Sequence, residues 1–492
     1  MPDTPTPTGR TGGAVPLRPN AVVAVLALAG IVVSLMQTLV IPIVPALPEY
    51  LRTSPSNAVW AITATLLAGS VATPVVGRLG DMFGKRRMLL VSVTLLVTGS
   101  IVCALSDSLV PMITGRALQG LSSAVIPLGI SVMRDVLPAE RLTGSTAVMS
   151  ASLGVGGALG LPSAAFIADR FDWHLLFWAA AVLGAVVLAL VLAFVPESRV
   201  RTGGSFDLVG AIGLSIALVS LLLAVSKGAD WGWDSGTTLG LFAVAVITLI
   251  AWGAYELRTA QPLVDLRTLA RRQVLFTNLA SIAFGFSMFA TALSLPQLLQ
   301  LPEQTGYGLG RSMLTVGLVL APQGLVMMAM APLSARITTT RGPKTTLMTG
   351  AVIVAAGYSL NIVLMSEVWH LILVSCVIAA GVGCAYGAMP ALIMGAVPAS
   401  ETAAANSLNT LMRSIGTSFA SAIAGVVLAR MTTTFGTTAL PSENGFKVVM
   451  AIGAGAALLA FALASFLPGR SAAARTAPVA AEEVGTPAAV KP

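Results

Sequence analysis

Two arginines interrupt the most apolar parts of this sequence. Arg116 lies in "GRALQG" and Arg413 in "NTLMRSIG", each within a long hydrophobic run. A guanidinium does not release its proton in a protein, and an arginine in an apolar segment normally faces the interior of a helix bundle. With no buried acid to pair them, the two arginines could neutralise an anionic ligand. Alternatively, Arg116 is a structural residue held by Gln119 and backbone carbonyls, and Arg413 is a structural or gate residue.

Acidic residues are absent from the middle of these runs. All twenty Asp and Glu residues lie in connecting segments, in the tails or at the ends of apolar runs. Coupling to protons requires a group that titrates, which leaves five candidates: Glu49, Asp81, Asp107, Asp135 and His174. The three cysteines have neither a disulfide nor a metal-binding spacing. We therefore expect no metal and no cofactor.

The segments that must position these residues are hydrophobic enough to cross a membrane. The chain has 492 residues, 56% of them hydrophobic and only 10% charged, with a mean hydropathy of +0.88; soluble domains carry about 25% charged residues. A helix needs ~20 mostly apolar residues to span the hydrocarbon. Fourteen runs qualify: 21–44, 59–76, 88–105, 109–133, 142–167, 175–194, 208–225, 239–252, 274–299, 313–333, 347–365, 371–397, 403–427 and 448–467. The sequence predicts an all-α polytopic membrane protein.

The distribution of Lys and Arg predicts the orientation of these spans. With the N-terminus inside and fourteen spans, 20 of the 28 basic residues fall in inside segments, six in outside loops and two within spans. Cytoplasmic loops collect Lys and Arg, so both termini are expected in the cytoplasm. Residues 1–20 and 469–492 are predicted to be disordered cytoplasmic tails. The inside loops also explain the formal charge of +8, so no nucleic-acid partner is needed.

One inside connector, "GRLGDMFGKRR", is unusually rich in charge and glycine. Its basic residues fit a topology anchor. It also resembles, in pattern and position, the loop signature between the second and third spans of the major facilitator superfamily, at Gly77, Asp81, Gly84, Arg86 and Arg87. The resemblance implies a conformational latch: Gly77 permits close helix approach, and Asp81 meets the positive end of a helix in the other half. It further implies that the basic residues pair with Asp135. The alternative is a solvated turn.

Weak internal repeats divide the chain into two halves, as in many transporters. "LPAER" and "VPASE" precede small-residue spans at an offset of 260, which aligns Gly156 with Gly416. "PLSARITTTRGPK" corresponds to the charged connector at an offset of 255, with Arg336 in the place of Asp81. The predicted organisation is the facilitator fold of two six-helix bundles plus two inserted helices: residues 21–198, 273–468 and, for the insert, 199–272.

The insert and the span count resemble the fourteen-span drug:proton antiporters of bacteria over about residues 26–467. "GRALQG" matches their fourth-span motif, which implies a part for Arg116 in proton transfer. "GGALGLP" resembles their fifth-span antiporter motif, with Pro162 one place later than usual. By resemblance, Gly156 and Gly160 belong to a small-residue face that lines the interface between the halves. Met36 stands where this family usually has an acidic residue.

A ligand cavity is expected near the middle of the membrane between the two halves. Aromatic and Met side chains adapt to varied apolar ligands, and scattered amides would supply polar contacts. Seven residues are candidates for lining it, with packing or lipid contact as the alternative for each: Met36, Gln37, Asn278, Gln297, Gln323, Tyr386 and Asn409.

The resemblance implies a secondary-active transporter, not an enzyme. It would export drugs, antibiotics or similar small organic molecules by proton antiport with alternating access, as a monomer in the bacterial inner membrane. An alternative is a narrow-specificity exporter of one metabolite, anionic or uncoupled. A membrane enzyme would need clustered catalytic groups, and a transport-dead sensor would need a sizeable soluble domain; neither pattern is found in the sequence.

Overall fold

The computed structural model describes residues 19–44, 46–198, 200–435 and 438–469. Within these ranges fourteen helices are long and apolar enough to cross a membrane. This confirms the predicted all-α, fourteen-span fold. The predicted disordered tails lie outside the described residues, except for residues 19, 20 and 469.

The N-terminal half contributes six spans. They are formed by α1 (Pro19–Thr38), α4 (Trp60–Phe83), α5 (Lys85–Ala104), α6 with η2 and α7 (Leu109–Gly120, Leu121–Ala124, Val125–Val136), α8 (Ala139–Arg170) and α9 (His174–Phe194). Three short helices join α1 to α4: η1 (Ile41–Ile43), α2 (Leu47–Tyr50) and α3 (Pro55–Ala58). The fourth span, predicted as one run, changes to 3₁₀ geometry at η2. There the hydroxyls of Ser122 and Ser123 donate to the carbonyls of Gln119 and Gly120, which competes with regular helical bonding.

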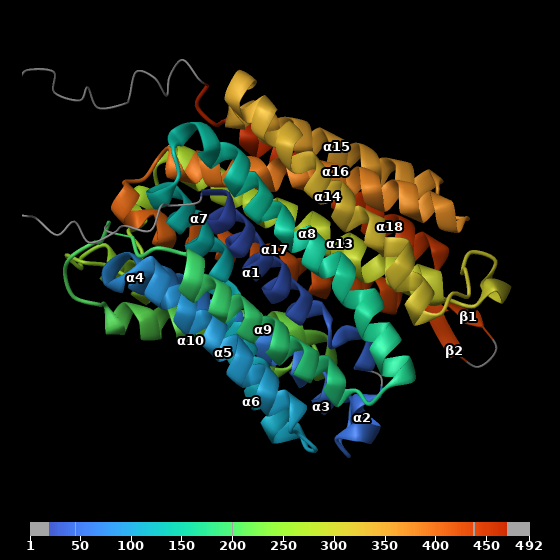
Figure 1. Cartoon of the computed structure of the whole chain (residues 1–492). Helices are drawn as coiled ribbons and strands as arrows, with labels where there is room; N and C mark the ends of the chain where they lie inside the picture. The colour runs from blue at the N-terminus through green and yellow to red at the C-terminus, as the bar shows by residue number, and fades with distance from the viewer. Residues whose placement is uncertain (1–18, 45, 199, 436–437, 470–492) are drawn as a thin grey trace, which may run out of the picture.

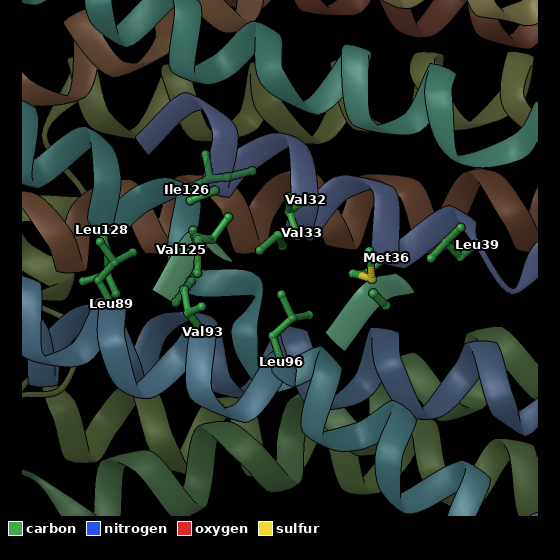
Figure 2. Packing of buried hydrophobic residues seen from close by; sticks show 14 of the residues in the cluster. Val32, Val33, Met36, Leu39, Leu89, Val93, Leu96, Val125, Ile126 and Leu128 are labelled. Atoms are coloured by element: carbon green, nitrogen blue, oxygen red, sulfur yellow. The ribbon is translucent and has the colours of Figure 1, made fainter. Parts of the chain in front are cut away.

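Buried aliphatic side chains hold this half together. Figure 2 shows Val32, Val33 and Met36 of α1 among side chains of α5 and α7, including Val93 and Val125. Met36 is 2% exposed, so its side chain belongs to the core of the N-terminal half.

The C-terminal half also contributes six spans: α13 (Arg272–Gln300), α14 (Met313–Arg341), α15 (Pro343–Val363), α16 (Val368–Met394), α17 (Thr402–Arg430) and α18 (Glu443–Ser465). The short elements are η3 (Glu303–Thr305), η4 (Ala399–Glu401) and an antiparallel hairpin of β1 (Thr432–Phe435) and β2 (Thr438–Pro441), in which Thr432 pairs with Pro441. Figure 1 shows α14, α15 and α16 along one side of the molecule and α5 and α6 along the other, with the hairpin at the right.

The two halves repeat the same close helix contacts. A Cβ at Gly156 of α8 would overlap the carbonyl oxygen of Ile31 in α1, and a Cβ at Gly416 of α17 would overlap that of Ile282 in α13. Gly156 and Gly416 are the pair aligned by the 260-residue offset. The repeat therefore appears as two glycines that each let the first helix of a half approach its fifth.

The insert lies against the junction of the halves. It consists of α10 (Leu208–Trp231), α11 (Gly236–Glu256) and the short α12 (Leu266–Leu269). Leu214 and Leu218 of α10 share a buried cluster with Leu408 and Leu411 of α17, and Val75 of α4 packs against it. The outer helix α11 packs chiefly on α10 and is mostly exposed. Helix α10 of the insert thus contacts α4 of one half and α17 of the other.

Candidate functional site

Asp81 joins the two halves at one end of the bundle, which we call the Asp81 end. Its carboxylate is fully buried, and it accepts hydrogen bonds from the backbone N–H groups of Ala403 (3.2 Å) and Ala404 (2.8 Å). These are free N–H groups of the first turn of α17, where the helix dipole favours a negative charge. Asp81 is therefore a helix cap supplied by the opposite half, which is the geometry that the loop signature implied.

The basic partner of this site is Lys85. Its Nζ lies 2.6 Å from Asp135 Oδ2 and 3.7 Å from Asp81 Oδ1, and it donates to the carbonyl of Ala399 at 3.4 Å. Lys85 is fully buried. The hydroxyl of Ser198 also donates to Asp135. The expected pairing with Asp135 is therefore made by Lys85.

Arg86 and Arg87 lie elsewhere. Arg86 donates to the carbonyl of Leu192 near the end of α9 (2.7 Å), and Arg87 is exposed. Successive residues of a helix point about 100° apart, so of three adjacent cations only one faces Asp135. Lys85, four residues after Asp81, has that direction.

Two glycines shape the contact. A Cβ at Gly77 would lie 2.9 Å from the carbonyl oxygen of Ala403 and would overlap the side chain of Ser407, so α4 and α17 approach here almost backbone to backbone. Gly84 has a φ of +117°, which disfavours other residues and permits the sharp turn from α4 into α5.

Two residues not expected from the sequence extend the junction. Arg134 of α7 donates to the hydroxyl of Thr402 (2.5 Å) and to the carbonyl of Val397 (3.1 Å). Thr202, in the segment before α10, donates its hydroxyl to the carbonyl of Ser400 and its N–H to that of Asp81. We call Asp81, Lys85, Arg134, Asp135 and Thr202, with the start of α17, the latch. Nothing in the sequence around Arg134 and Thr202, apart from a charge and a hydroxyl, indicates that they contact the other half.

Arg116 is enclosed within the N-terminal half. It is 1% exposed, and its guanidinium donates to the carbonyls of Ala61 (2.8 Å) and Met36 (3.1 Å) and to Gln119 Oε1 (2.6 Å). The amide of Gln119 continues the network to Ser100 Oγ (2.8 Å). Among the described residues no carboxylate forms an ion pair with Arg116. The arrangement matches the structural alternative stated for this arginine.

This network predicts a stability effect. We expect Arg116→Ala to lower the melting temperature of the purified protein, because the Met36 carbonyl and the Gln119 oxygen lose this donor in a buried site; each unsatisfied group costs about 1–3 kcal/mol. The Ala61 carbonyl keeps the hydroxyl of Thr65 at 3.3 Å. Arg116→Lys should retain part of the stability. Thermal unfolding followed by size-exclusion chromatography measures both. A wild-type melting temperature for Arg116→Ala would contradict the structural role.

In the C-terminal half, Arg413 contacts an aromatic ring, whereas Asn278 and Asn409 contact each other. The guanidinium of Arg413 lies over the ring of Tyr386, 4.6 Å from its centroid, which is a cation–π arrangement. Asn409 donates to Asn278 Oδ1 (2.8 Å) and to the hydroxyl of Ser281 (2.7 Å), which ties α17 to α13. The asparagines therefore bond within the half.

A small, largely apolar cavity of about 170 Å³ lies between the halves. It is lined from α1, α8, α13, α14 and α16, by residues that include Thr38, Gly157, Met288, Gln323 and Met327. Of the seven residues expected to line a cavity, it contains Gln323. The other six lie outside its lining: Met36, Gln37, Asn278, Gln297, Tyr386 and Asn409. Which side of a helix faces such a cavity depends on the rotation of that helix, and these spans are apolar on every face.

The small residues of α8 serve two neighbours. Gly156 and Gly160 face α1, where a Cβ would overlap Ile31 and Thr38 respectively. Pro162 faces α14, with its Cα 2.7 Å from the position of a Cβ at Gly317. Ala147 and Ala151 of α8 continue this second contact against Ala331. The α8–α14 contact therefore extends along both helices and is built from small side chains.

These features define a polytopic helical membrane protein of two bundles. A family model described as Major Facilitator Superfamily matches residues 26–421, with a second match over residues 275–491. The chain belongs to the major facilitator superfamily.

The chain is similar to proteins of bacterial drug resistance. It is 25% identical over 375 residues to the multidrug transporter protein MdtP of Bacillus subtilis, which covers 75% of this chain and 68% of that protein. It is 31% identical over 336 residues to the probable multidrug resistance protein EmrY of Escherichia coli, which covers 67% and 63%. Among solved structures, the human organic anion transporter MFSD10 matches with a TM-score of 0.63 and 17% identity, over 91% of this chain and 99% of that one. At that identity the likeness concerns the fold.

Proposed function

We propose that this protein is a secondary-active exporter of drugs, antibiotics or similar small organic molecules. The observation that carries the proposal is the latch: a carboxylate of one half caps a helix of the other, so that the halves are joined at one end by contacts that rigid-body rocking would break. The similarity to MdtP and EmrY supports the substrate class.

The excess of Lys and Arg at the Asp81 end supports a cytoplasmic position for it, with both termini inside a bacterial plasma membrane. In that orientation the structure corresponds to a state closed toward the cytoplasm. The transport unit in this proposal is one chain with two six-helix bundles, residues 21–198 and 273–468, and the insert of residues 199–272. Protons are the proposed coupling ion.

The proposal is tested by dye accumulation in an exporter-deficient bacterial host. We expect expression of the chain to lower accumulation of ethidium and of labelled antibiotics, and a protonophore to restore it. Unchanged accumulation of every compound in the panel would reject broad drug export. Export that persists with the protonophore would reject proton coupling.

A narrow exporter of an anionic metabolite is the second candidate. It is favoured by one observation: no carboxylate of the described chain pairs with Arg116 or Arg413. Arg413, which is only partly buried, is the better placed of the two to meet a ligand. Uptake of labelled organic anions into inverted vesicles would distinguish this function.

Gln323 is expected to influence substrate choice. Its amide is one of few polar groups in a lining that otherwise consists mainly of Gly, Ala, Met and aliphatic side chains. We expect Gln323→Leu to change efflux of polar substrates by about tenfold, because one good hydrogen bond to a ligand contributes about 1.5 kcal/mol, and to spare apolar ones. Gln300→Leu, at an exposed position, is the control. Equal efflux profiles for Gln323→Leu and wild type would remove Gln323 from the substrate path.

A further inference from the structure

Two carboxyl groups of the insert are buried together at the Asp81 end. Asp207 precedes α10 and Glu256 is the last residue of α11, and they are 9% and 2% exposed. Asp207 Oδ1 accepts hydrogen bonds from the N–H of Gly210 (2.8 Å) and the hydroxyl of Tyr255 (3.1 Å). Within the described ranges, Asp207 Oδ2 and both oxygens of Glu256 have no hydrogen-bond partner. The backbone of Leu263 and Val264 and the indole of Trp252 face Glu256, and the indole N–H of Trp252 donates to the carbonyl of Gly210 at 2.9 Å.

The two carboxyl groups lie close to each other. Asp207 Oδ2 and Glu256 Oε1 both lie within 2.5 Å of the point that a Cβ would occupy at Gly210, so they are at most 5 Å apart. Two ionised carboxylates at this separation repel, and burial strengthens the repulsion. A single proton between them would replace the repulsion with a hydrogen bond, as in other carboxyl pairs.

In the described part of the chain, no cation lies within ion-pair distance of either carboxylate. Glu256 lines a cavity of about 360 Å³, and the other charged residues on its wall are Arg78 of α4, Asp265 in the loop after α11, Arg267 of α12 and Glu401 of η4. Arg267 donates to the carbonyl of Leu257, and Asp265 accepts from the N–H of Arg267 and the hydroxyl of Thr268.

This cavity is built from the elements that the latch holds together. Its wall includes Pro74 and Arg78 of α4, Val274 of α13 and Ala404 of α17. Ala404 is itself a hydrogen-bond donor to Asp81. Separation of α4 from α17 would therefore widen the cavity and admit water to Glu256.

We propose that Asp207 and Glu256 form a proton-binding pair, which holds one proton while the latch is closed and releases it toward the Asp81 end when α4 and α17 separate. This inference rests on the proposed function for its role in transport, since it supplies the titrating group that the spans lack. The proton site itself follows from the burial and proximity of the two groups.

The proton site is tested by infrared spectroscopy of the full chain in liposomes of bacterial lipid. We expect a protonated-carboxyl band at neutral pH in the wild type that disappears in Asp207→Asn/Glu256→Gln. Glu367→Gln, at an exposed helix cap, should leave the band unchanged. The same band in the double variant and the wild type would overturn the proton site.

The link to the latch has its own readout. Gly77→Val should force α4 from α17 by its clash with Ser407, and the band should then vanish at lower pH than in the wild type. If Gly77→Val fails to fold, Asp81→Asn replaces it. The infrared titration of Asp81→Asn is then compared with that of Asp81→Asn combined with Asp207→Asn/Glu256→Gln. An unchanged titration in a folded latch variant would overturn the coupling to α4 and α17.

Ethidium export is the third measurement. If the wild type exports ethidium, the double variant should lose the response to a protonophore and Glu367→Gln should keep it; a normal response in the double variant would overturn the coupling role. If the wild type moves no ethidium, the proposed function fails for this substrate, and the infrared measurements still decide whether the pair holds a proton.

Discussion

Asp81→Asn is expected to reduce transport at least tenfold while the protein still inserts and folds. The substitution keeps the size of the side chain but replaces a charged acceptor of two backbone N–H groups with a neutral amide. Hydrogen bonds to charged groups contribute about 1.5–3 kcal/mol each, and 1.4 kcal/mol is a tenfold change in an equilibrium. The equilibrium should therefore shift toward the state in which the Asp81 end is open.

The shift can be measured without a known substrate. A cysteine introduced by Ala405→Cys, in a variant lacking Cys103, Cys376 and Cys384, reports on access to the cavity beside the latch. A membrane-impermeant thiol reagent should label it faster when Asp81 is replaced. Asp234→Asn, at an exposed position between α10 and α11 at the opposite end, is the matched control. Equal labelling rates and normal transport in Asp81→Asn would reject the latch.

Gly156→Ala is expected to destabilise the protein strongly, and Gly157→Ala to have little effect. A Cβ at Gly156 would overlap the Ile31 carbonyl and lie 2.6 Å from Ser34 Cβ and 2.9 Å from the backbone nitrogen of Leu35. A Cβ at Gly157 meets only Ser34 Oγ, at 4.0 Å. Backbone atoms of a packed helix cannot move aside independently, and such overpacking costs about 1–3 kcal/mol.

The C-terminal half offers the same comparison at Gly416 and Gly425. Gly416→Ala should behave as Gly156→Ala does, because its Cβ would overlap Ile282, whereas Gly425 of the same helix has open space around it. Melting temperatures of the four alanine variants test the pattern. Similar stability for Gly156→Ala and Gly157→Ala would show that α1 and α8 are less closely packed than described.

The spans and the main contact of Asp81 were predictable from the sequence, because each has a pattern that fits few other structures. The fourteen spans follow from hydropathy, and the contact of Asp81 with a helix of the other half was implied by the resemblance of its loop to the facilitator signature. The choice of Lys85 over Arg86 and Arg87 was not predictable, because it depends on the direction each residue takes after Gly84. The pair of Asp207 and Glu256 was missed for a similar reason: 49 residues separate two acids that each look like an ordinary helix end.

Two of the contacts between the halves, α4–α17 and α8–α14, differ in kind. In the α4–α17 contact, the carboxylate of Asp81 accepts hydrogen bonds from two N–H groups of α17. The residue on α14 that corresponds to Asp81 is Arg336, so α14 has no such carboxylate. The α8–α14 contact consists instead of small side chains such as Ala147, Ala151 and Ala331. Hydrogen bonds are lost abruptly with separation, but contacts between small residues tolerate a slight rotation. The α8–α14 contact is therefore suited to be the hinge axis, and the α4–α17 contact the edge that parts. An opening at that edge would face α10, which packs on both α4 and α17, so the insert separates the edge from the membrane leaflet and α10 must leave one of its two neighbours when the edge parts.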